Sequence, residues 1–231
     1  MKRILKVIGI LFLGGLLFLW YIHEPLPEEN SSAQADMLAH KMLNALDYQR
    51  YKNTRFLEWS YRNGANQYKW DKENGVVEVK WDEFLVLLDL VNTTRSKVMK
   101  SGKSISQQKE SNEIAKALKM FNNDSFWLVA PYKVFDKGTT RSIVMLDDGS
   151  QGLLVSYSQG GTTPGDHYLW KLNPDGFPNS FKMWVKIIPI GGIEATWDDW
   201  KVMESGAYLP QSHQLGPLTL DMGNIKGYQS F

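Results

Sequence analysis

The chain has 231 residues, of which 43% are hydrophobic and 22% are charged, a composition typical of a folded protein rather than a disordered one. Its net charge is +1, and the part after residue 22 has 23 basic and 25 acidic residues, which excludes the basic surface that nucleic-acid binding needs. Cysteine is absent, which excludes disulfides, thiolate metal sites, cysteine catalysis and lipid attachment through a cysteine.

The N-terminus has the pattern of a membrane anchor or an export signal. An unbroken apolar run of 16 residues, Val7–Ile22, follows a basic start, and with Lys6 reaching back to the interface the segment approaches the length of about 20 residues that a spanning helix needs. Trp20 and Tyr21 end the run, as aromatic residues do at a membrane interface. Residues 1–23 are therefore predicted to be an anchor or signal, with the following chain outside the cytoplasm.

The anchor and the signal differ in whether the segment is removed. A signal peptide needs a small-residue cleavage site soon after its apolar run. The candidate site, Ala33-Gln34-Ala35, lies 13 residues after Ile22, which favours an uncleaved anchor. Residues 24–35, "EPLPEENSSAQA", are predicted to be a polar, proline-containing linker, and residues 36–231 the folded domain.

A change in hydrophobic period marks the start of the domain. Apolar residues recur at helical spacing between Met37 and Leu46, which predicts an amphipathic helix that begins near Ser32. The spacing then changes to alternation in "FLEWSYR", "QYKWDK" and "VVEVKW", and the turn sequences "NGAN" and "ENG" separate these segments. Alternation of this kind predicts three β-strands joined by two hairpins.

The two turns predict how the three strands pair. The first hairpin is folded about Asn63–Asn66, and the second has Asn74-Gly75 as a two-residue turn. The predicted pairs are Trp59 with Trp70, Tyr61 with Tyr68, Trp70 with Val79, and Tyr68 with Trp81. Both turns put the large side chains on one face and the polar ones on the other, so a three-stranded meander is predicted.

The rest of the chain alternates between strand and helix patterns. Phe84–Leu90 predicts a further strand with apolar residues on both faces, so part of its second face should be covered. A mid-chain helix is predicted around Ile114–Phe121, followed by a loop packed on the sheet. The C-terminal strand candidates are Ser142–Leu146, Gly152–Ser158, His167–Leu172, Ser180–Ile188, Ile193–Lys201, Tyr208–His213 and Leu218–Asp221. The order predicts an α+β fold, in which helices lie against the concave side of a curved antiparallel sheet or half-open β-barrel.

Several segments carry a family resemblance. They are "ADMLAHKMLNAL", "YKWDKENG", "SFWLVAPYKVFDKG", "HYLWKLNPDGFPNSFKMWV" and "GIEATWDDW". In this order, over residues 36–231, they resemble the LolA/LolB-like superfamily of bacterial envelope lipoprotein carriers. The resemblance implies a half-open antiparallel β-barrel with helices over an apolar cavity that receives acyl chains. It also implies a place in the bacterial cell envelope: anchored in the inner membrane with the domain in the periplasm, or periplasmic if cleaved.

The chain departs from that family in two ways. A soluble carrier leaves the membrane, whereas this chain is predicted to stay anchored. A LolB-type receptor is anchored by a lipid on a cysteine, which is absent here. Lipoprotein delivery itself is therefore a hypothesis, and the firmer expectation is non-catalytic binding of a lipid, an acyl chain or another hydrophobic ligand.

The aromatic stripe supplies the candidate cavity lining. Its predicted members are Trp59, Tyr61, Tyr68, Trp70, Val79, Trp81, Trp170 and Trp184. The alternative is that these side chains fill a closed core, and that the protein is an envelope structural or interaction module without a ligand. The expected partners are a hydrophobic ligand and the membrane through residues 1–23, with an envelope protein as a further candidate and with no nucleic acid, cofactor or metal.

Other chemistry has weaker signals. A metal site would draw on Asp166, His167, Asp198, Asp199 or His213, but no ligand spacing such as HExxH is present. The G-x-S-x-G elbow of a serine hydrolase is also missing, and the sequence alone does not bring Ser156 near a histidine. Adjacent residues in a strand point to opposite faces, so Asp198 and Asp199 make a poor catalytic pair.

One stretch combines most of these signals: "WVKIIPIGGIEATWDDW", residues 184–200. Its glycine pair matches no phosphate-binding motif and opens no helix. Pro189 cannot donate to a sheet ladder, and Gly191 and Gly192 allow the chain to bend. The stretch is predicted to be two strands joined or kinked at "PIGG", with Trp184 and Trp197 as parts of a curved wall.

Overall fold

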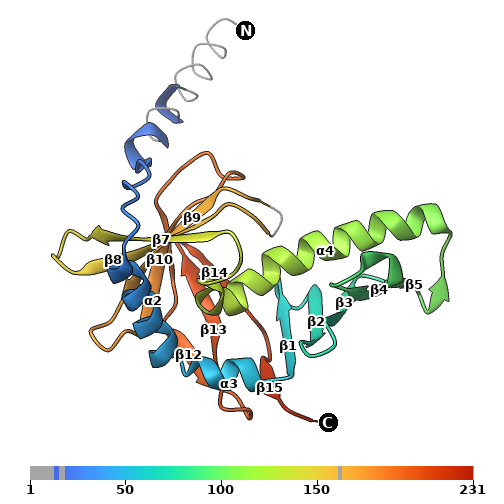
Figure 1. The fold of residues 1–231 in the computed structure, drawn as a ribbon. Helices are drawn as coiled ribbons and strands as arrows, with labels where there is room; N and C mark the ends of the chain where they lie inside the picture. The colour runs from blue at the N-terminus through green and yellow to red at the C-terminus, as the bar shows by residue number, and fades with distance from the viewer. Residues whose placement is uncertain (1–12, 16–18, 161–162, 231) are drawn as a thin grey trace, which may run out of the picture.

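The computed structural model describes residues 13–15, 19–160 and 163–230. Three antiparallel sheets and one long helix make this an α+β protein (Figure 1), as predicted. Most of the predicted anchor, residues 1–23, lies outside the described residues. In the part of the chain that the structure describes, no helix is both long enough and apolar enough to cross a membrane.

Helices α2 and α3 lie between the predicted linker and the first strand. Helix α2 (Ala33–Ala45) begins where the sequence predicts, because the Ser32 side chain accepts a hydrogen bond from the backbone N–H of Ala35 and caps the first turn. Its apolar stripe packs on the five-stranded sheet and includes Ala39 and Met42, both 0% exposed. Helix α3 (Tyr48–Asn53) follows directly.

The largest sheet has seven strands and begins with the predicted meander. Its strands, in sheet order, are β15 (Lys226–Tyr228), β1 (Phe56–Tyr61), β2 (Asn66–Asp71), β3 (Val76–Trp81), β4 (Phe84–Asp89), β5 (Lys97–Lys100) and β6 (Lys103–Ser104). A short 3₁₀ turn, η1 (Thr93–Arg95), joins β4 to β5. On β4, Val86 and Leu88 are buried on one face, whereas Leu85 and Leu87 are half-buried on the other, between side chains of β3 and β5.

The predicted strand pairs are wrong by two residues in both hairpins. Trp59 lies opposite Tyr68, Tyr68 lies opposite Val79, and Trp70 lies opposite Val77. The first turn spans residues 62–65, one residue earlier than the predicted 63–66, and the second has four residues, 72–75, in place of the predicted two. The second turn is held by Asp71, whose carboxylate accepts from the backbone and side-chain N–H groups of Asn74. A shift of two residues keeps every side chain on its predicted face, so the aromatic face itself is unchanged.

Two further sheets form the other part of the molecule. The five-stranded sheet contains β11 (Ile193–Thr196), β10 (Pro178–Trp184), β9 (Asp166–Leu172), β8 (Gln151–Tyr157) and β7 (Thr139–Met145). The three-stranded sheet contains β12 (Asp199–Val202), β13 (Tyr208–Leu215) and β14 (Leu218–Asp221). The predicted single strand 193–201 is therefore two strands in different sheets. The chain changes sheet at Trp197, which is 0% exposed. The predicted join at "PIGG" is confirmed as the connection from β10 to β11.

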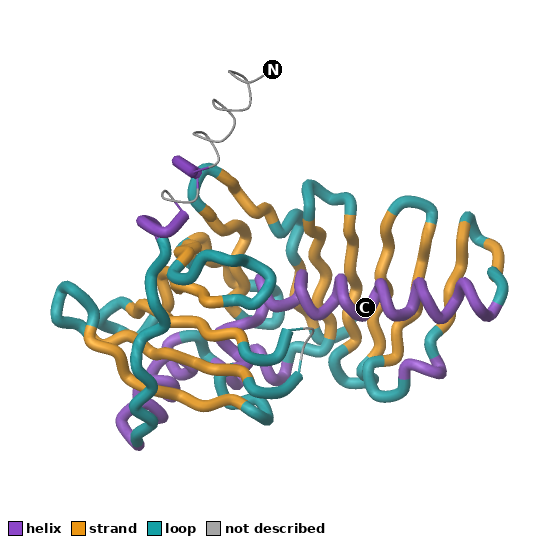
Figure 2. Tube along the Cα trace, turned by 90° about the horizontal axis from the view of Figure 1, so that it is seen from above, coloured by secondary structure: helices purple, strands orange, loops and turns teal. Residues whose placement is uncertain are grey.

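Helix α4 (Gln107–Val129) connects the two parts of the fold. Figure 2 shows it crossing the strands of the seven-stranded sheet, and its N-terminal half lies against β4 and β5. Its C-terminal half packs on the five-stranded sheet, where Phe126 contacts Tyr168 and Trp127 contacts Phe181. The helix continues into a 3₁₀ turn, η2 (Ala130–Lys133), which is the predicted loop packed on the sheet.

The predicted linker is bound to the domain. Residues 23–31 cross the outer face of the five-stranded sheet, from Gly191, whose backbone bonds with His23 and Glu24, to a β-bridge between Ser31 and Ser142 on β7. The linker is thus the cover of a small outer cluster of Leu154, Leu169 and Trp184.

Candidate functional site

Six of the eight predicted lining residues lie together on the face of the seven-stranded sheet that α4 covers. They are Trp59, Tyr61, Tyr68, Trp70, Val79 and Trp81. Trp59 and Tyr68 are paired across β1 and β2, and their rings stack at 4.6 Å between centroids. Trp59 and Trp81 are buried, whereas Tyr61 and Trp70 are half-buried. We call these six residues the aromatic face.

Helix α4 closes this face with a small number of side chains. The Phe121 ring contacts Trp70 edge-on, with centroids 5.2 Å apart, and lies 6.2 Å from Trp59. The Lys116 ammonium is 4.9 Å from the centroid of the Trp81 ring, a cation–π distance. Both contacts come from α4, so the cover of the aromatic face is one amphipathic element.

Asp124 is the buried polar contact between α4 and the sheet. Asp124 is 3% exposed. Its carboxylate accepts hydrogen bonds from Asn66 Nδ2 at 2.9 Å and from the Tyr68 hydroxyl at 2.5 Å. Burial and the Asp124 carboxylate raise the pKa of Tyr68 well above its ordinary value. The same two causes raise the pKa of Tyr61 to about 12, so both phenols are neutral donors at physiological pH.

Sequence reasoning missed Asp124 because "NNDSF" has the composition of a solvated helix surface. The available signal was its position: Asp124 follows Phe121 by three residues and precedes Leu128 by four, which places it on the buried stripe. A carboxylate at such a position needs partners from the facing sheet. Asn66 and Tyr68 supply them.

The aromatic face also contains unpaired donors. Among the described residues, the buried indole nitrogens without a hydrogen-bond partner are those of Trp59, Trp70, Trp81, Trp170 and Trp197. A buried donor without a partner costs about 1–3 kcal/mol, so several in one protein call for a physical reason. Three of these five donors, those of Trp59, Trp70 and Trp81, belong to the aromatic face.

The structure separates the last two predicted lining residues from the aromatic face and from each other. Trp170 lies in the five-stranded sheet against Phe181 and Trp197, with centroids 5.1 and 5.0 Å away. Trp184 points to the opposite face of that sheet, where its indole N–H donates to the Glu24 carbonyl at 2.8 Å. Trp184 therefore holds the linker.

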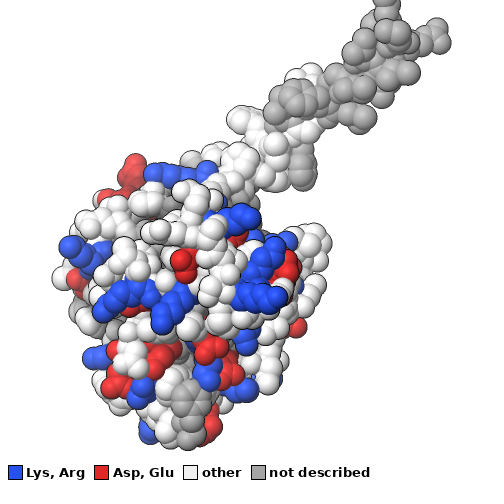
Figure 3. Space-filling model, turned by 90° about the vertical axis from the view of Figure 1, so that its right-hand side faces the viewer, with Lys and Arg blue, Asp and Glu red and all other residues white. Residues whose placement is uncertain are grey.

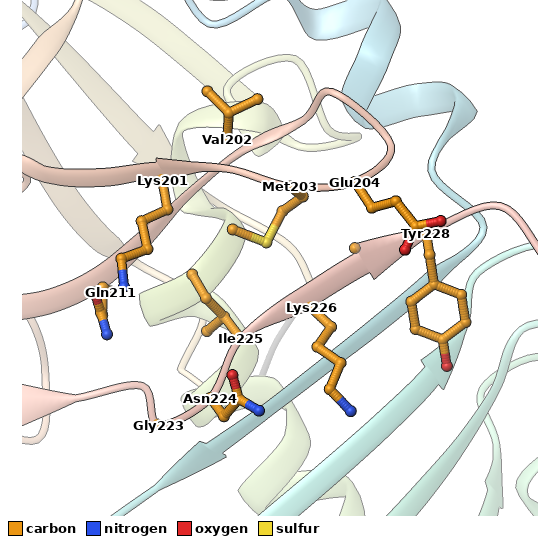
Figure 4. A pocket seen from close by; sticks show the side chains of 11 residues that line it. Lys201, Val202, Met203, Glu204, Gln211, Gly223, Asn224, Ile225, Lys226 and Tyr228 are labelled. Carbon is orange, nitrogen blue, oxygen red and sulfur yellow. The ribbon is translucent and has the colours of Figure 1, made fainter.

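Two surface pockets lie away from the aromatic face. One, of about 550 Å³, lies between the linker and the five-stranded sheet; its lining includes Pro25, Leu169, Lys182 and Trp184. The other, of about 300 Å³, lies between β12 and the C-terminal strand β15 (Figure 4). In that view Met203 and Ile225 lie at the centre, with lysine and glutamate side chains around them. Its volume is at the lower limit of ligand pockets, and its mixed charges favour no single ligand class.

Ser156, His167 and Glu29 meet on the outer face of the five-stranded sheet. His167 Nδ1 is 2.8 Å from the Ser156 hydroxyl and 3.1 Å from the Glu29 carboxylate, and the hydroxyl also donates to that carboxylate. A catalytic triad needs the serine and the acid on different ring nitrogens, so that one orients the base while the other reacts. Here both partners share Nδ1, and the group acts as a bond between the linker and the sheet.

The residues weighed as metal ligands are dispersed. Within the described residues, no group of three or more His, Asp or Glu side chains is arranged to hold a metal ion. His213 is 1% exposed; Nδ1 lies 2.8 Å from the Thr196 carbonyl and Nε2 lies 2.7 Å from that of Trp127. Burial lowers the pKa of His213. This ring joins α4 to the end of β11.

The surface charge is mixed. Lysine, arginine, aspartate and glutamate side chains are interspersed over the face seen in Figure 3. Opposite charges also pair across the five-stranded sheet and its linker, as in Lys182–Glu24 and Lys171–Glu194. Comparison with known protein families finds no matching family model. Comparison with curated proteins finds no similar sequence.

Proposed function

We propose that the protein is a membrane-anchored, extracytoplasmic binding protein that takes a lipid, a lipoprotein acyl chain or another hydrophobic ligand between α4 and the aromatic face. The observation that carries the proposal is the set of unpaired indole donors of Trp59, Trp70 and Trp81 beneath a single amphipathic helix. An acyl chain gains about 0.8 kcal/mol for each CH₂ group that it buries. Its ester or carboxyl oxygens would also give those donors acceptors.

The fold assigned with this function is the half-open antiparallel barrel of the LolA/LolB-like superfamily, with α4 as the lid on its concave side. Residues 1–23 then hold the chain in the inner membrane of a bacterial envelope, with the domain in the periplasm. The docked linker supports retention of the anchor. Cleavage after Ala35 would remove Glu24 and Glu29, which bond to the sheet, and would cut inside α2, where Ala35 is 0% exposed.

The binding function requires no chemistry from the protein. The ligand is held by apolar contact and donated hydrogen bonds, and Asp124 holds the lid by accepting from Asn66 and Tyr68. We therefore propose a non-catalytic role without a cofactor or a nucleic-acid partner. A second envelope protein that delivers or receives the ligand remains part of the hypothesis.

The test is binding of a fluorescent fatty acid to the purified full chain in detergent, together with mass spectrometry of lipids that co-purify with it. The variant Trp70→Phe removes one unpaired indole N–H and keeps an aromatic ring. Its matched control is Trp200→Phe, because the Trp200 N–H already donates to backbone carbonyls such as that of Pro178. We expect saturable binding that Trp70→Phe weakens and Trp200→Phe leaves unchanged.

The second candidate function is an envelope interaction module with a filled core and no ligand. The close burial of Trp59, Val79 and Trp81, which are 3%, 0% and 4% exposed, favours it. Absence of saturable binding by the wild-type chain, with no lipid co-purified, would replace the first proposal by this one.

A further inference from the structure

The connection from β10 to β11 contains a turn with an apolar tip. The backbone N–H of Ile188 donates to the Val185 carbonyl at 3.0 Å, which closes a four-residue turn with Lys186 and Ile187 at its corners. Ile187 is 69% exposed. Corner positions favour glycine, proline, asparagine, aspartate and serine, and Ile187 departs from this preference with an exposed, β-branched apolar side chain.

The fold fixes where this tip points. The backbone N–H of Lys186 donates to Asp166 Oδ1 at 3.0 Å, and the backbone N–H of Gly192 donates to the Met183 carbonyl at 3.0 Å. The connection that contains the turn is therefore tied to β9 at Lys186 and to β10 at Gly192. Ile187 is presented in one direction relative to the domain.

The same connection is bonded to the residues that follow the apolar N-terminal run. Glu24 N–H donates to the Gly191 carbonyl at 3.0 Å, and Gly191 N–H donates to His23 Nδ1 at 3.0 Å. His23 is the residue directly after the run Val7–Ile22. His23 and Glu24 therefore lie beside the connection that contains the apolar turn.

Further exposed apolar side chains come just before His23 in the chain. Trp20 is 78% exposed and Tyr21 is 82% exposed, and amphipathic aromatic rings are stabilised at the boundary between lipid headgroups and acyl chains. Lys186 adds a positive charge at the turn, which the negative surface of a membrane that contains anionic lipid attracts.

We propose that the turn Val185–Ile188 is a second membrane contact of the protein, in which Ile187 enters the headgroup region of the bilayer beside the anchor. This contact rests on the anchor assigned under the proposed function and adds to it a contact made by the folded domain. A domain held only by its anchor is free to rotate. A domain that also contacts the lipid through a turn close to the anchor has a fixed orientation. The five-stranded sheet then stands with its β10–β11 end on the lipid.

The absence of cysteine allows a direct test with single labels. The full chain carrying Ile187→Cys is labelled with an environment-sensitive fluorophore and reconstituted into phosphatidylcholine–phosphatidylglycerol vesicles that contain a lipid with a nitroxide in its headgroup. The matched control is Leu218→Cys on β14, which is also exposed, at 60%. We expect the nitroxide to quench the label at position 187 and to leave the label at position 218 unquenched; equal quenching at both positions would overturn the second contact.

Flotation of the same vesicles separates the two proposals. A chain that floats with the vesicles while the label at 187 is unquenched retains the anchor and loses the second contact. A chain that fails to float overturns the anchor and the contact with it. As a second variant, Ile187→Asp should increase rotation of a label at position 218 on floating vesicles, seen as lower fluorescence anisotropy; unchanged anisotropy would also count against the contact.

Discussion

The two larger sheets both carry aromatic side chains on their inner faces, but these faces are covered in different ways. On the five-stranded sheet, Trp170 and Phe181 meet Trp197 from the segment between sheets, and all three are 0% exposed. On the seven-stranded sheet the cover is α4, and Trp70 and Tyr61 remain half-buried. Around Trp170 the five-stranded sheet is closed by Trp197, with Trp127 of α4 also against Phe181, whereas the aromatic face is closed by α4.

This difference bears on function because different contacts must be lost to open each cover. Parting Trp197 from Trp170 would displace the chain between two sheets and the ladder that holds it. Parting α4 from the aromatic face requires loss of the Asp124 hydrogen bonds and of ring contacts such as Phe121 with Trp70. Local opening takes the path with fewer buried contacts, so a ligand would enter under α4.

The largest expected effect comes from truncating the closed face. Trp170→Ala should lower the free energy of unfolding by about 3–5 kcal/mol, because it opens a cavity in a site that cannot collapse. Trp70→Ala should cost less, because the ring is already half-exposed. Urea unfolding of both variants measures the difference. Equal losses of unfolding free energy in Trp70→Ala and Trp170→Ala would mean that the aromatic face is packed as tightly under α4 as the five-stranded sheet is around Trp170.

The outer face of the five-stranded sheet can be tested through the linker that covers it. A Cβ atom at Gly191 would lie 2.3 Å from Cδ1 of Trp184 and 2.6 Å from the Glu24 carbonyl oxygen, so Gly191→Val should cost about 1–3 kcal/mol by overpacking and release the linker. Limited proteolysis around Glu24–Glu29 measures that release. The control Gly149→Val meets no atom within 4 Å, and its cost is only the strain of φ +80°; cleavage of the linker in the control as well would remove the assigned cause.

The hold of α4 on the aromatic face depends on one buried carboxylate. Asp124→Ala leaves Asn66 and the Tyr68 hydroxyl without their acceptor, which should cost about 1–3 kcal/mol in total and speed hydrogen exchange along α4. Asn123→Ala removes only a neighbour that donates to the same carboxylate and is the matched control. If exchange in α4 is the same in both variants, Asp124 is not what holds the helix down.

The sequence predicted these faces better than it predicted their covers. Alternation in β1 to β3 placed Trp59, Tyr68 and Trp70 on one face whichever turn was used, because a slip of two residues preserves the face. The pairing itself depended on where each turn begins and how long it is. In the second hairpin the local sequence "ENG" leaves the length open, and the Asp71 contacts with Asn74 decide it. The face of the sheet on which a side chain lies is set by alternation within one strand. The pairing register depends on two strands and the turn between them.

The covers were missed because each depends on contacts between residues far apart in the chain. Asp124 has the composition of a surface residue until Asn66 and Tyr68 are placed opposite it. The linker has the composition of a free spacer, yet Glu24 is bonded to Trp184 and Gly191, 160 or more residues later. Trp184 was expected in the same wall as Trp170. Side chains alternate between the two faces along a strand. Two positions an odd number of steps apart, on one strand or on aligned neighbouring strands, therefore lie on opposite faces, and this separates the two tryptophans.

The smallest expected effect concerns the His213 ring, which joins α4 to β11. Burial lowers the pKa of His213 in the folded state below the value of about 6.5 that an unfolded chain has. As the pH falls through about 6.5, the unfolded state binds a proton before the folded state does. The free energy of unfolding therefore falls, by at most about 1.4 kcal/mol per pH unit for one group. Urea unfolding between about pH 7 and about pH 5 should therefore show a smaller loss for His213→Gln than for wild type. The nearby Asp198 carboxylate acts in the opposite direction and raises the pKa of His213, so Asp198→Asn should show a loss as large as that of wild type or larger. The same loss in wild type and His213→Gln would mean that other groups set the pH dependence and that the junction of α4 with the five-stranded sheet is insensitive to protonation.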